Sequence, residues 1–406
     1  MHTPGAEARI GLEQGMPGLK SRLTLKLGLL LGLAAVAGMT ARAQWEVVTP
    51  APTNADLRGI DNVGKGVAWA SGTEGTVLRT INDGKDWQRC ATPPDAEKLD
   101  FRGIQAFDAN TAIVMSSGKG DLSRLYKTTD GCQTWKLVFT NPDPEGFWDG
   151  IKFSSRDFGV LLGDPVNNIF VVMLTFNGGD KWERQTLRAT EDVNGESVFA
   201  ASNSSLLLSS YPGYRRFCTG GRGGPRLISF VASMSNDTGD YEPDRSKLHY
   251  FRDLDAERLE TKTPHFESSG CFSIASDDQF GTSVAVGGNY ERADDQEDTA
   301  WTTASMSSRA TDLLLFHPSK TPPHGYRSAV AYDAASKTWI TVGPNGTDIS
   351  TDDGRNWRAL RPNTAVGEAP DADQHWNALS LPFVVGPHGR IGKLRPDALT
   401  PAKGGK

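Results

Sequence analysis

The stretch "TTDGCQTW", residues 128–135, has three near-copies elsewhere in the chain. They are "TINDGKDW" at 80–87, "TFNGGDKW" at 175–182 and "STDDGRNW" at 350–357. Each contains a Ser or Thr, an Asp or Asn two residues later, a nearby Gly and a final Trp. We call each such stretch a box. A turn motif that is used four times indicates that the structural unit around it is also repeated.

The spacing of the boxes indicates the size of that unit. The first two boxes begin 48 residues apart and the third follows 47 residues later, a period typical of four-stranded propeller blades. Before each box, three short apolar or β-branched runs are separated by Gly, Asn and Asp, as in consecutive antiparallel strands. A fourth run follows each Trp, as in "WQRCATP" at 87–93. The box is therefore expected to join the third and fourth strands of a blade.

Each conserved position of the box has a physical role in such a turn. The short Asp or Asn side chain bonds nearby backbone N–H groups, and Gly supplies a positive φ angle. The Trp is expected to be buried between neighbouring sheets, where its large ring packs and fixes the turn. The structural box residues expected on this basis are Asn82, Gly84, Trp87, Asp130, Trp135, Asn177, Gly179, Trp182, Asp352, Gly354 and Trp357.

The remaining sequence completes a ring of blades. The third and fourth boxes begin 175 residues apart, which leaves room for two blades without a box, one beginning near Gly195 with "SVFAASNSS" and one near Gly270. After the last box only three strands follow, and "WEVVTP" at 45–50 has the pattern of the missing fourth. We therefore expect an all-β, seven-bladed propeller over residues 44–395, closed by its N-terminal strand, because closure removes exposed sheet edges. Six or eight blades remain alternatives, since the two unboxed blades are irregular.

Residues 1–43 have the pattern of a secretory signal peptide. Basic residues precede an apolar run at 27–38, and Ala41-Arg42-Ala43 fits a cleavage site. That run is too short for a membrane span, which needs roughly twenty residues. The sequence thus predicts a periplasmic or secreted chain with no transmembrane anchor after cleavage near Ala43. Residues 396–406 are expected to be a disordered tail.

Charge and cysteine content limit the classes of partner. Without residues 1–43 the chain keeps 38 basic and 47 acidic residues, an acidic balance that argues against nucleic-acid binding. The cysteines fit no zinc pattern and could form disulfides in an exported chain, with their pairing left open. No cofactor or metal is predicted, because nucleotide and haem motifs are absent and the acidic run at 290–300 lacks the spacing of a calcium loop. The chain is expected to be a monomer. The four cysteines are Cys90, Cys132, Cys218 and Cys271.

The S/T-x-D/N-x-G-x-x-W turn resembles the Asp-box of BNR-repeat propellers. The order of "GTEGTVLRT" at 72–80, box and Trp is similar to the photosystem II assembly/stability factor-like branch of these WD40/YVTN/BNR-like repeats. The resemblance covers roughly residues 45–395 and implies the propeller fold. Asp-box propellers include sialidases, other glycoside hydrolases, sorting receptors and assembly factors, so the fold alone does not give the function.

The starts of the inner strands are the first place to look for a binding site. Arg58, Arg102 and Arg327 occupy comparable strand starts, where together they could bind a carboxylate or an acidic segment of a partner protein through bidentate pairing. The resemblance implies the same, because assembly-factor relatives carry an arginine patch on such a surface. The alternative is that each arginine pairs with a neighbouring carboxylate such as Asp149 or Glu196.

A glycine-rich turn supplies one further binding candidate. The stretch "GGRGGPR", residues 220–226, is expected to join the second and third strands of a blade and carries Arg222. It lacks the Lys-Ser/Thr pair and the strand-to-helix context of a phosphate-binding loop. A flexible β-turn is therefore expected there.

The enzymatic alternative is a glycoside hydrolase. Such an enzyme needs two carboxylates across a cleft, and Asp149 and Asp164 are the best placed pair. A sialidase relative would carry an Arg-Ile-Pro stretch where this chain reads "LRGI" at 57–60, and no Tyr/Glu nucleophile pair can be assigned. We therefore predict an exported, non-catalytic binding or assembly module, with the glycoside hydrolase as the alternative.

Overall fold

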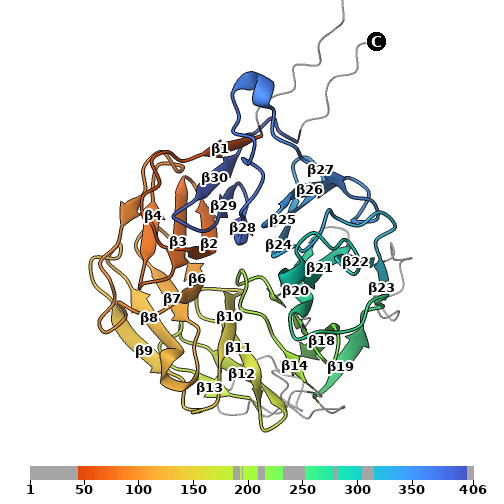
Figure 1. The fold of residues 1–406 in the computed structure, drawn as a ribbon. Coiled ribbons are helices and arrows are strands. Elements are labelled where there is room, and N and C mark those ends of the chain that lie inside the picture. Colours follow the sequence, from red (N-terminus) through yellow and green to blue (C-terminus); the bar gives the residue numbers. More distant parts are fainter. Residues whose placement is uncertain are drawn as a thin grey trace, which may run out of the picture. The chain divides into compact units, whose positions relative to one another are not determined.

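Four-stranded antiparallel sheets make up almost all of the regular structure in the computed structural model (Figure 1). It describes residues 44–185, 193, 195–208, 215–231, 252–277, 281–303 and 315–399. The predicted signal peptide and residues 400–406 lie outside this range. All described residues belong to one compact unit, and none of their helices is long and apolar enough to cross a bilayer.

The first three blades follow the chain outward from an inner strand. Blade 1 contains β2 (Leu57–Gly64), β3 (Val67–Gly72), β4 (Val77–Thr80) and β5 (Gln88–Arg89). Blade 2 contains β6 (Phe101–Ala106), β7 (Ala112–Ser116), β8 (Arg124–Thr128) and β9 (Lys136–Thr140). Blade 3 contains β10 (Trp148–Phe153), β11 (Gly159–Val166), β12 (Ile169–Thr175) and β13 (Glu183–Arg184). In each of them the box joins the third strand to the fourth, as expected.

The other four blades repeat this plan. Blade 4 contains β15 (Leu206–Leu208), β16 (Arg215–Cys218), β18 (Arg226–Val231) and β19 (Arg252–Arg258). Blade 5 contains β20 (Ser269–Ser276), β21 (Ser283–Asn289), β22 (Ala300–Thr303) and β23 (Phe316–Pro318). Blade 6 contains β24 (Ala329–Asp333), β25 (Thr338–Gly343), β26 (Gly346–Ser350) and β27 (Arg358–Ala359). Blade 7 contains β28 (Ala378–Ser380), β29 (Phe383–Val385), β30 (Ile391–Leu394) and β1 (Trp45–Val47). Single 3-10 turns are η1 (Gly120–Leu122), η2 (Tyr290–Arg292) and η3 (Thr364–Val366).

The seven sheets form a closed ring (Figure 1). Each inner strand contacts the next, from β2 through β6, β10, β15, β20, β24 and β28, and β28 contacts β2 again. Seven hydrophobic clusters among the described residues fill the interfaces, each with side chains from two adjacent blades. Since such burial is the main favourable term in folding, each blade is stabilised mostly by its two neighbours. The seven-blade prediction is confirmed.

Both ends of the chain build blade 7. Strand β1 pairs antiparallel with β30, and Trp45 lies opposite Leu394. The backbone N–H of Trp45 donates to Glu368 Oε1 over 2.6 Å, and its buried ring lies 5.9 Å from that of Trp376. The N-terminal strand therefore closes the ring, as expected from the sequence.

The C-terminal boundary needs a small correction. The propeller was expected to end at residue 395, but Ala398 and Leu399 pack against the hydrophobic cluster between blades 6 and 7. These apolar side chains bury surface that an extended tail would expose. The part of the predicted tail at 396–399 therefore belongs to the propeller.

Blade 4 also departs from its predicted assignment. The stretch at 197–205 is not its inner strand; that strand is β15, where Leu206 faces Phe217 of β16. Glu196–Ser197 instead forms β14, which pairs with β17 (Gly220–Gly221), and β17 pairs with β20 of blade 5. The stretch that follows β14 is rich in Ser and Asn, and these side chains bond to other blades.

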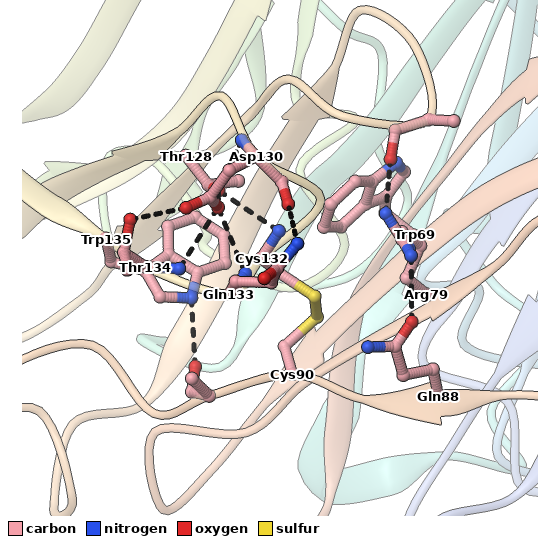
Figure 2. The surroundings of a disulfide bond; sticks show 12 residues. Trp69, Arg79, Gln88, Cys90, Thr128, Asp130, Cys132, Gln133, Thr134 and Trp135 are labelled. Carbon is pink, nitrogen blue, oxygen red and sulfur yellow. Dashed lines mark hydrogen bonds between the residues drawn. A yellow bond between two sulfur atoms is a disulfide. The ribbon is translucent and has the colours of Figure 1, made fainter.

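The second box shows how the turns are built (Figure 2). Asp130 Oδ1 accepts hydrogen bonds from the backbone N–H groups of Gln133 and Thr134, both over 3.0 Å, and Oδ2 accepts one from the Thr134 hydroxyl over 2.6 Å. The bonds from Thr134 lower the pKa of Asp130 to about 2. The carboxylate thus stays ionised and holds the turn over most of the pH range.

Two disulfides join neighbouring blades. Cys90, after β5 of blade 1, is bonded to Cys132 in the box of blade 2 (Figure 2). Cys132 has a φ of 64°, in the left-handed region that Gly84, Gly179 and Gly354 occupy in the other boxes. The second disulfide, Cys218–Cys271, joins blades 4 and 5. The sequence left this pairing open.

Three of the four box tryptophans are buried between blades, as predicted. Trp135, Trp182 and Trp357 are 8%, 6% and 4% exposed, and each indole N–H donates a hydrogen bond. Trp87 is less buried than the other three, although it also packs against a hydrophobic cluster. Its ring packs edge-on against Phe383 at 5.7 Å, and its N–H has no acceptor among the described residues. This Trp faces blade 7, which offers it an apolar ring but no acceptor.

Candidate functional site at the start of the inner strands

Four inner strands begin with a β-bulge at the same position. The pairing register shifts at Arg58 in β2, Arg102 in β6, Asp149 in β10 and Phe272 in β20. A bulge leaves one residue unpaired and re-aims its side chain. In an antiparallel blade these strand starts lie at the end opposite the box turns. Four blades therefore present one extra side chain each at this end of the ring.

A glycine follows three of these bulges, and the close packing of the inner strands requires it at two of them, Gly59 and Gly103. A Cβ on Gly59 would lie 2.6 Å from Ser71 Oγ and 3.1 Å from the Arg102 carbonyl oxygen. A Cβ on Gly103 would lie 3.0 Å from side chains of Ile151 and Met115. The repeated "RGI" and "DGI" stretches are thus the local signature of the bulge.

The segment at 198–205 crosses the centre of the ring (Figure 1). Asn203 Nδ2 donates to the carbonyl oxygen of Ile104 in blade 2 over 3.1 Å, and its Oδ1 accepts from the N–H of Ile151 in blade 3 over 2.8 Å. Ser202 Oγ donates to the Ser328 carbonyl oxygen at the start of blade 6 over 2.7 Å.

The same segment also contacts blade 5. Ser204 Oγ lies 2.7 Å from Ser273 Oγ, and the Ile274 N–H donates to the Ser204 carbonyl oxygen over 2.9 Å. Blades 2 and 3 lie across the ring from blades 5 and 6, so one segment that bonds to all four must occupy the middle. A ligand that enters from the strand starts therefore meets this segment and cannot pass through the ring.

Arg58 and Arg102 differ in how they are paired. Arg102 Nε donates to Asp100 Oδ2 over 2.8 Å, and its Nη1 donates to the Ala200 carbonyl oxygen of the crossing segment over 3.3 Å. Arg58 lies 3.8 Å from Asp56 and 3.9 Å from Asp100, beyond hydrogen-bond distance, and donates no side-chain hydrogen bond to a described residue. Its side chain is 29% exposed. Arg58 is thus a guanidinium with donors to spare.

Two carboxyl groups of blade 3, Asp149 and Asp164, act on each other electrostatically. Burial, and then the charge of Asp164, raise the pKa of Asp149 well above its ordinary value, while Arg102 opposes the shift. Burial raises the pKa of Asp164 to about 6, although its Oδ1 accepts a 2.9 Å hydrogen bond from the Val198 N–H. A raised pKa favours the neutral form of Asp149, which then cancels less of the positive charge of Arg102.

A cluster of four aromatic rings, which was not predicted from the sequence, includes Phe199, the residue directly before the Ala200 that bonds to Arg102. Phe199 stacks on Phe272 at 3.9 Å between ring centroids, and Tyr326 meets Phe272 edge-on at 4.8 Å. Tyr290 lies 6.1–6.4 Å from all three rings. Alignment of the bulges would have placed Phe272 in register with Arg58. We call these four residues the aromatic cluster, and together with Arg58, Arg102 and Asp149 they form the mouth.

The charges of the mouth connect these two groups. Burial raises the pKa of Tyr326 strongly, the nearby Tyr290 raises it further, and the positive charges of Arg58 and Arg102 act in the opposite direction. The Tyr326 hydroxyl is thus within the field of both arginines and of Tyr290. Both arginines therefore act electrostatically on a tyrosine of the aromatic cluster.

Arg327 does not join the mouth. Its side chain is fully buried, where Nε donates to Asp348 Oδ2 over 2.9 Å and Nη1 donates to Asn345 Oδ1 over 2.5 Å. Blade 6 starts without the bulge, and the guanidinium turns into the blade toward these acceptors on the β25–β26 side. The expected patch of three arginines is corrected to a pair.

The remaining charged residues that were predicted to bind a ligand or an arginine, Arg222 and Glu196, form ion pairs with other partners. Arg222 is exposed and pairs with Glu267 at 2.8 Å, in the blade 4 turn. Glu196 pairs with Arg226 at 2.7 Å in a buried site, so it neutralises none of the predicted arginines. The alternative of arginines paired with neighbouring acids thus holds for Arg102 and Arg327, although their partners are Asp100 and Asp348.

The geometry gives little support to the glycosidase alternative. Asp149 is 1% exposed, and Asp164 is engaged by the backbone of the crossing segment. A sugar ring would have to lie between two accessible carboxyl groups. Within the described parts of the chain, no group of three or more His, Cys, Asp or Glu side chains is arranged to hold a metal ion.

Comparisons with known proteins show the fold. No family model and no curated protein matches the sequence. The structure is similar to "YCF48 bound to D1 peptide", with 15% identity and a TM-score of 0.55, covering 88% of this chain and 98% of that one. It is also similar to YCF48 from Cyanidioschyzon merolae (19%, TM-score 0.55, 87% and 100% covered). The WD40 β-propeller domain of Doa1 follows (9%, TM-score 0.51, 88% and 97% covered).

Proposed function

We propose that this chain is a non-catalytic binding module whose mouth captures a protein segment that carries a carboxylate. Arg58 carries the proposal, because its guanidinium is partly exposed and has no side-chain hydrogen bond to a described residue. A planar guanidinium with free donors is suited to bidentate pairing with a carboxylate. Arg102, fixed by Asp100 and the crossing segment, adds a second positive charge beside it.

The surrounding structure supports binding at the surface. The crossing segment closes the ring below the mouth, so the ligand would lie on the mouth as an extended segment. One structurally similar protein, YCF48, has been solved with a bound peptide from D1. A propeller of this fold can thus hold a peptide, and we propose the same class of ligand for this chain.

We further propose that the chain works as a monomer outside the cytoplasm. The N-terminal sequence has the charge, apolar run and cleavage pattern of a secretory signal. Two disulfides between blades are compatible with an oxidising compartment, since thiols are kept reduced in the cytosol. Detection of the chain in the periplasmic or secreted fraction, starting near Gln44, would test this part.

Selection from a peptide library tests the ligand class. Decapeptides with randomised sequence and free C-termini would be captured on the immobilised mature chain, and the best binder measured by fluorescence anisotropy as the acid and as the C-terminal amide. We expect the acid to bind at least about tenfold more tightly, since each tenfold is about 1.4 kcal/mol and a charge-assisted pair contributes that much or more. Binding should weaken between 50 and 300 mM salt.

Matched variants connect that result to the mouth. Arg58→Gln should remove the difference between acid and amide, while Lys136→Gln, an exposed cation on the outer strand β9, should preserve it. The proposal fails if no peptide binds, or if Arg58→Gln keeps the full preference for the acid. Incubation with sialosides and β-glucans should give no turnover; hydrolysis that is lost in Asp149→Asn would favour an enzyme.

A further inference from the structure

We propose that the aromatic cluster gives the mouth its specificity: it selects a ligand whose apolar C-terminal side chain packs on Tyr290 and Phe199 while its carboxylate pairs with Arg58. This inference rests on the proposed function and adds a requirement to it. The carboxylate determines that a ligand binds, whereas the aromatic cluster determines which residue stands beside that carboxylate.

The exposure of Tyr290 is the first observation. Its side chain is 49% exposed, although three aromatic rings lie within 6.4 Å. A tyrosine needed only for packing would bury its ring against that cluster, whereas this ring keeps nearly half of its surface in water. Phe199 beside it is half-buried. Together they offer an apolar surface, with Phe272 and Tyr326 as its buried base.

The cluster is built rigidly. A Cβ on Gly220 would lie 2.5 Å from the Phe199 ring, and one on Gly270 would lie 3.0 Å from it, so both glycines leave room for that ring. Phe199 then stacks on Phe272 with an angle of 12° between the ring planes. A surface that is already ordered loses little conformational entropy when a ligand binds, which favours its use in recognition.

The position of Arg58 identifies the occupant. Arg58 and Arg102 both lie at Asp100, and Arg102 donates to the carbonyl oxygen of Ala200, which directly follows Phe199 in the chain. The Phe199 ring lies 6.4 Å from that of Tyr290. The mouth thus combines two features, a guanidinium with free donors and an exposed aromatic surface. A carboxylate and an apolar side chain that occur next to each other would match this pair. The C-terminal residue of a protein carries both groups on one Cα atom.

The test uses the best decapeptide from the library, synthesised with Leu, Phe, Ser or Asn as its last residue, each as acid and amide. For the wild-type chain we expect the Leu and Phe acids to bind about tenfold or more tightly than the Ser and Asn acids, as burial of a large apolar side chain predicts. Tyr290→Ser should reduce this ratio to about twofold or less and leave the ratio of acid to amide unchanged. Tyr290→Phe should retain both ratios, because the ring supplies the surface.

Two further variants separate the contributions. Arg58→Gln should lose the preference for the acid and keep the preference for Leu and Phe. Leu137→Ser, which changes a residue that is 45% exposed on the outer strand β9, should keep both preferences. Thermal unfolding of each variant verifies that it is folded. The Tyr290 variants are expected to fold, because this residue is 49% exposed.

The outcomes are distinct. Binding that depends on the carboxylate but ignores the last side chain would overturn this inference and leave the proposed function intact. An apolar preference that persists in Tyr290→Ser would also overturn it, since the preference would then come from elsewhere. Absence of binding by every peptide would overturn the proposed function and the inference together.

Discussion

Arg327 donates hydrogen bonds from both Nε and Nη2 to the same oxygen of Asp348, and neither side chain is exposed to solvent. His324 bonds the other oxygen of this carboxylate over 2.5 Å. The pair ties the start of blade 6 to its third strand. An arginine that seemed available for a ligand is thus a structural element, and it can be distinguished from Arg58 by experiment.

We expect Arg327→Ala to lower the free energy of unfolding by about 3–5 kcal/mol, because it leaves the buried Asp348 carboxylate without its partner. Arg58→Ala, which removes only weak surface ion pairs, should change it by about 0–1 kcal/mol. Urea unfolding followed by fluorescence measures both. Equal effects of the two substitutions would contradict the distinction between a structural and a ligand-binding arginine.

The box tryptophans should differ in their contribution to stability. Replacement of Trp135, Trp182 or Trp357 by Ala should cost about 3–5 kcal/mol, as for other large buried side chains, because each is 8% exposed or less. Trp87→Ala should cost less, since that residue is only partly buried. Loss of peptide binding by a folded, stable Trp→Ala variant would show that the boxes do more than support the blades.

Deletion of residues 44–50 should lower the melting temperature sharply. It removes β1 from blade 7, exposes the edge of β30 and takes the Trp45 side chain out of the cluster between blades 6 and 7. Differential scanning calorimetry measures the change, and deletion of residues 401–406 provides the control. An unchanged transition after the loss of 44–50 would mean that the ring does not need its closing strand.

Reduction of the disulfides should also destabilise the ring. The Cys90–Cys132 bond closes a loop with a sequence separation of 42 residues. Breaking a disulfide that closes a loop of this size lowers the free energy of unfolding by about 2–4 kcal/mol. The double variant Cys90→Ser/Cys132→Ser should therefore unfold at lower urea than the wild type under oxidising conditions. In the presence of dithiothreitol the two proteins should differ much less. Mass mapping of proteolytic fragments should identify the linked peptides.

The free energy of unfolding should depend on pH through the ionisation of Asp164. The pKa of its carboxyl group is about 6 in the folded chain, compared with an ordinary value of 3.8, so the folded state binds the proton more tightly than the unfolded state. The protonated Asp164 therefore contributes its full stabilisation of the fold below about pH 4. This contribution, at most about 3 kcal/mol, is lost as the pH rises through 6. Asp164→Asn cannot ionise, so its stability relative to the wild type should rise between pH 4 and pH 7. A relative stability that is constant over this range would exclude the shift.

The fold could be predicted from the sequence alone, because it depends on local sequence patterns that repeat with a regular period. The boxes, their spacing and the strand pattern around them each reflect one blade, and the lone N-terminal strand matched the one missing from the last blade. The bulges were not predicted, although three of them coincide with the similar stretches "LRGI" at 57–60, "FRGI" at 101–104 and "WDGI" at 148–151. These features depend on contacts within about fifty residues of chain, which a single sequence can show.

Only the tertiary structure determined the mouth. Arg58 and Arg327 have similar places in the sequence, but Asp348 and Asn345 draw one guanidinium into blade 6 while Arg58 keeps free donors. The crossing segment at 198–205, read as a strand, is fixed by side-chain bonds to four blades. Such partners are distant along the chain. Packing and desolvation across the ring decide which of them meet, and a local pattern of residues carries no information about these long-range contacts.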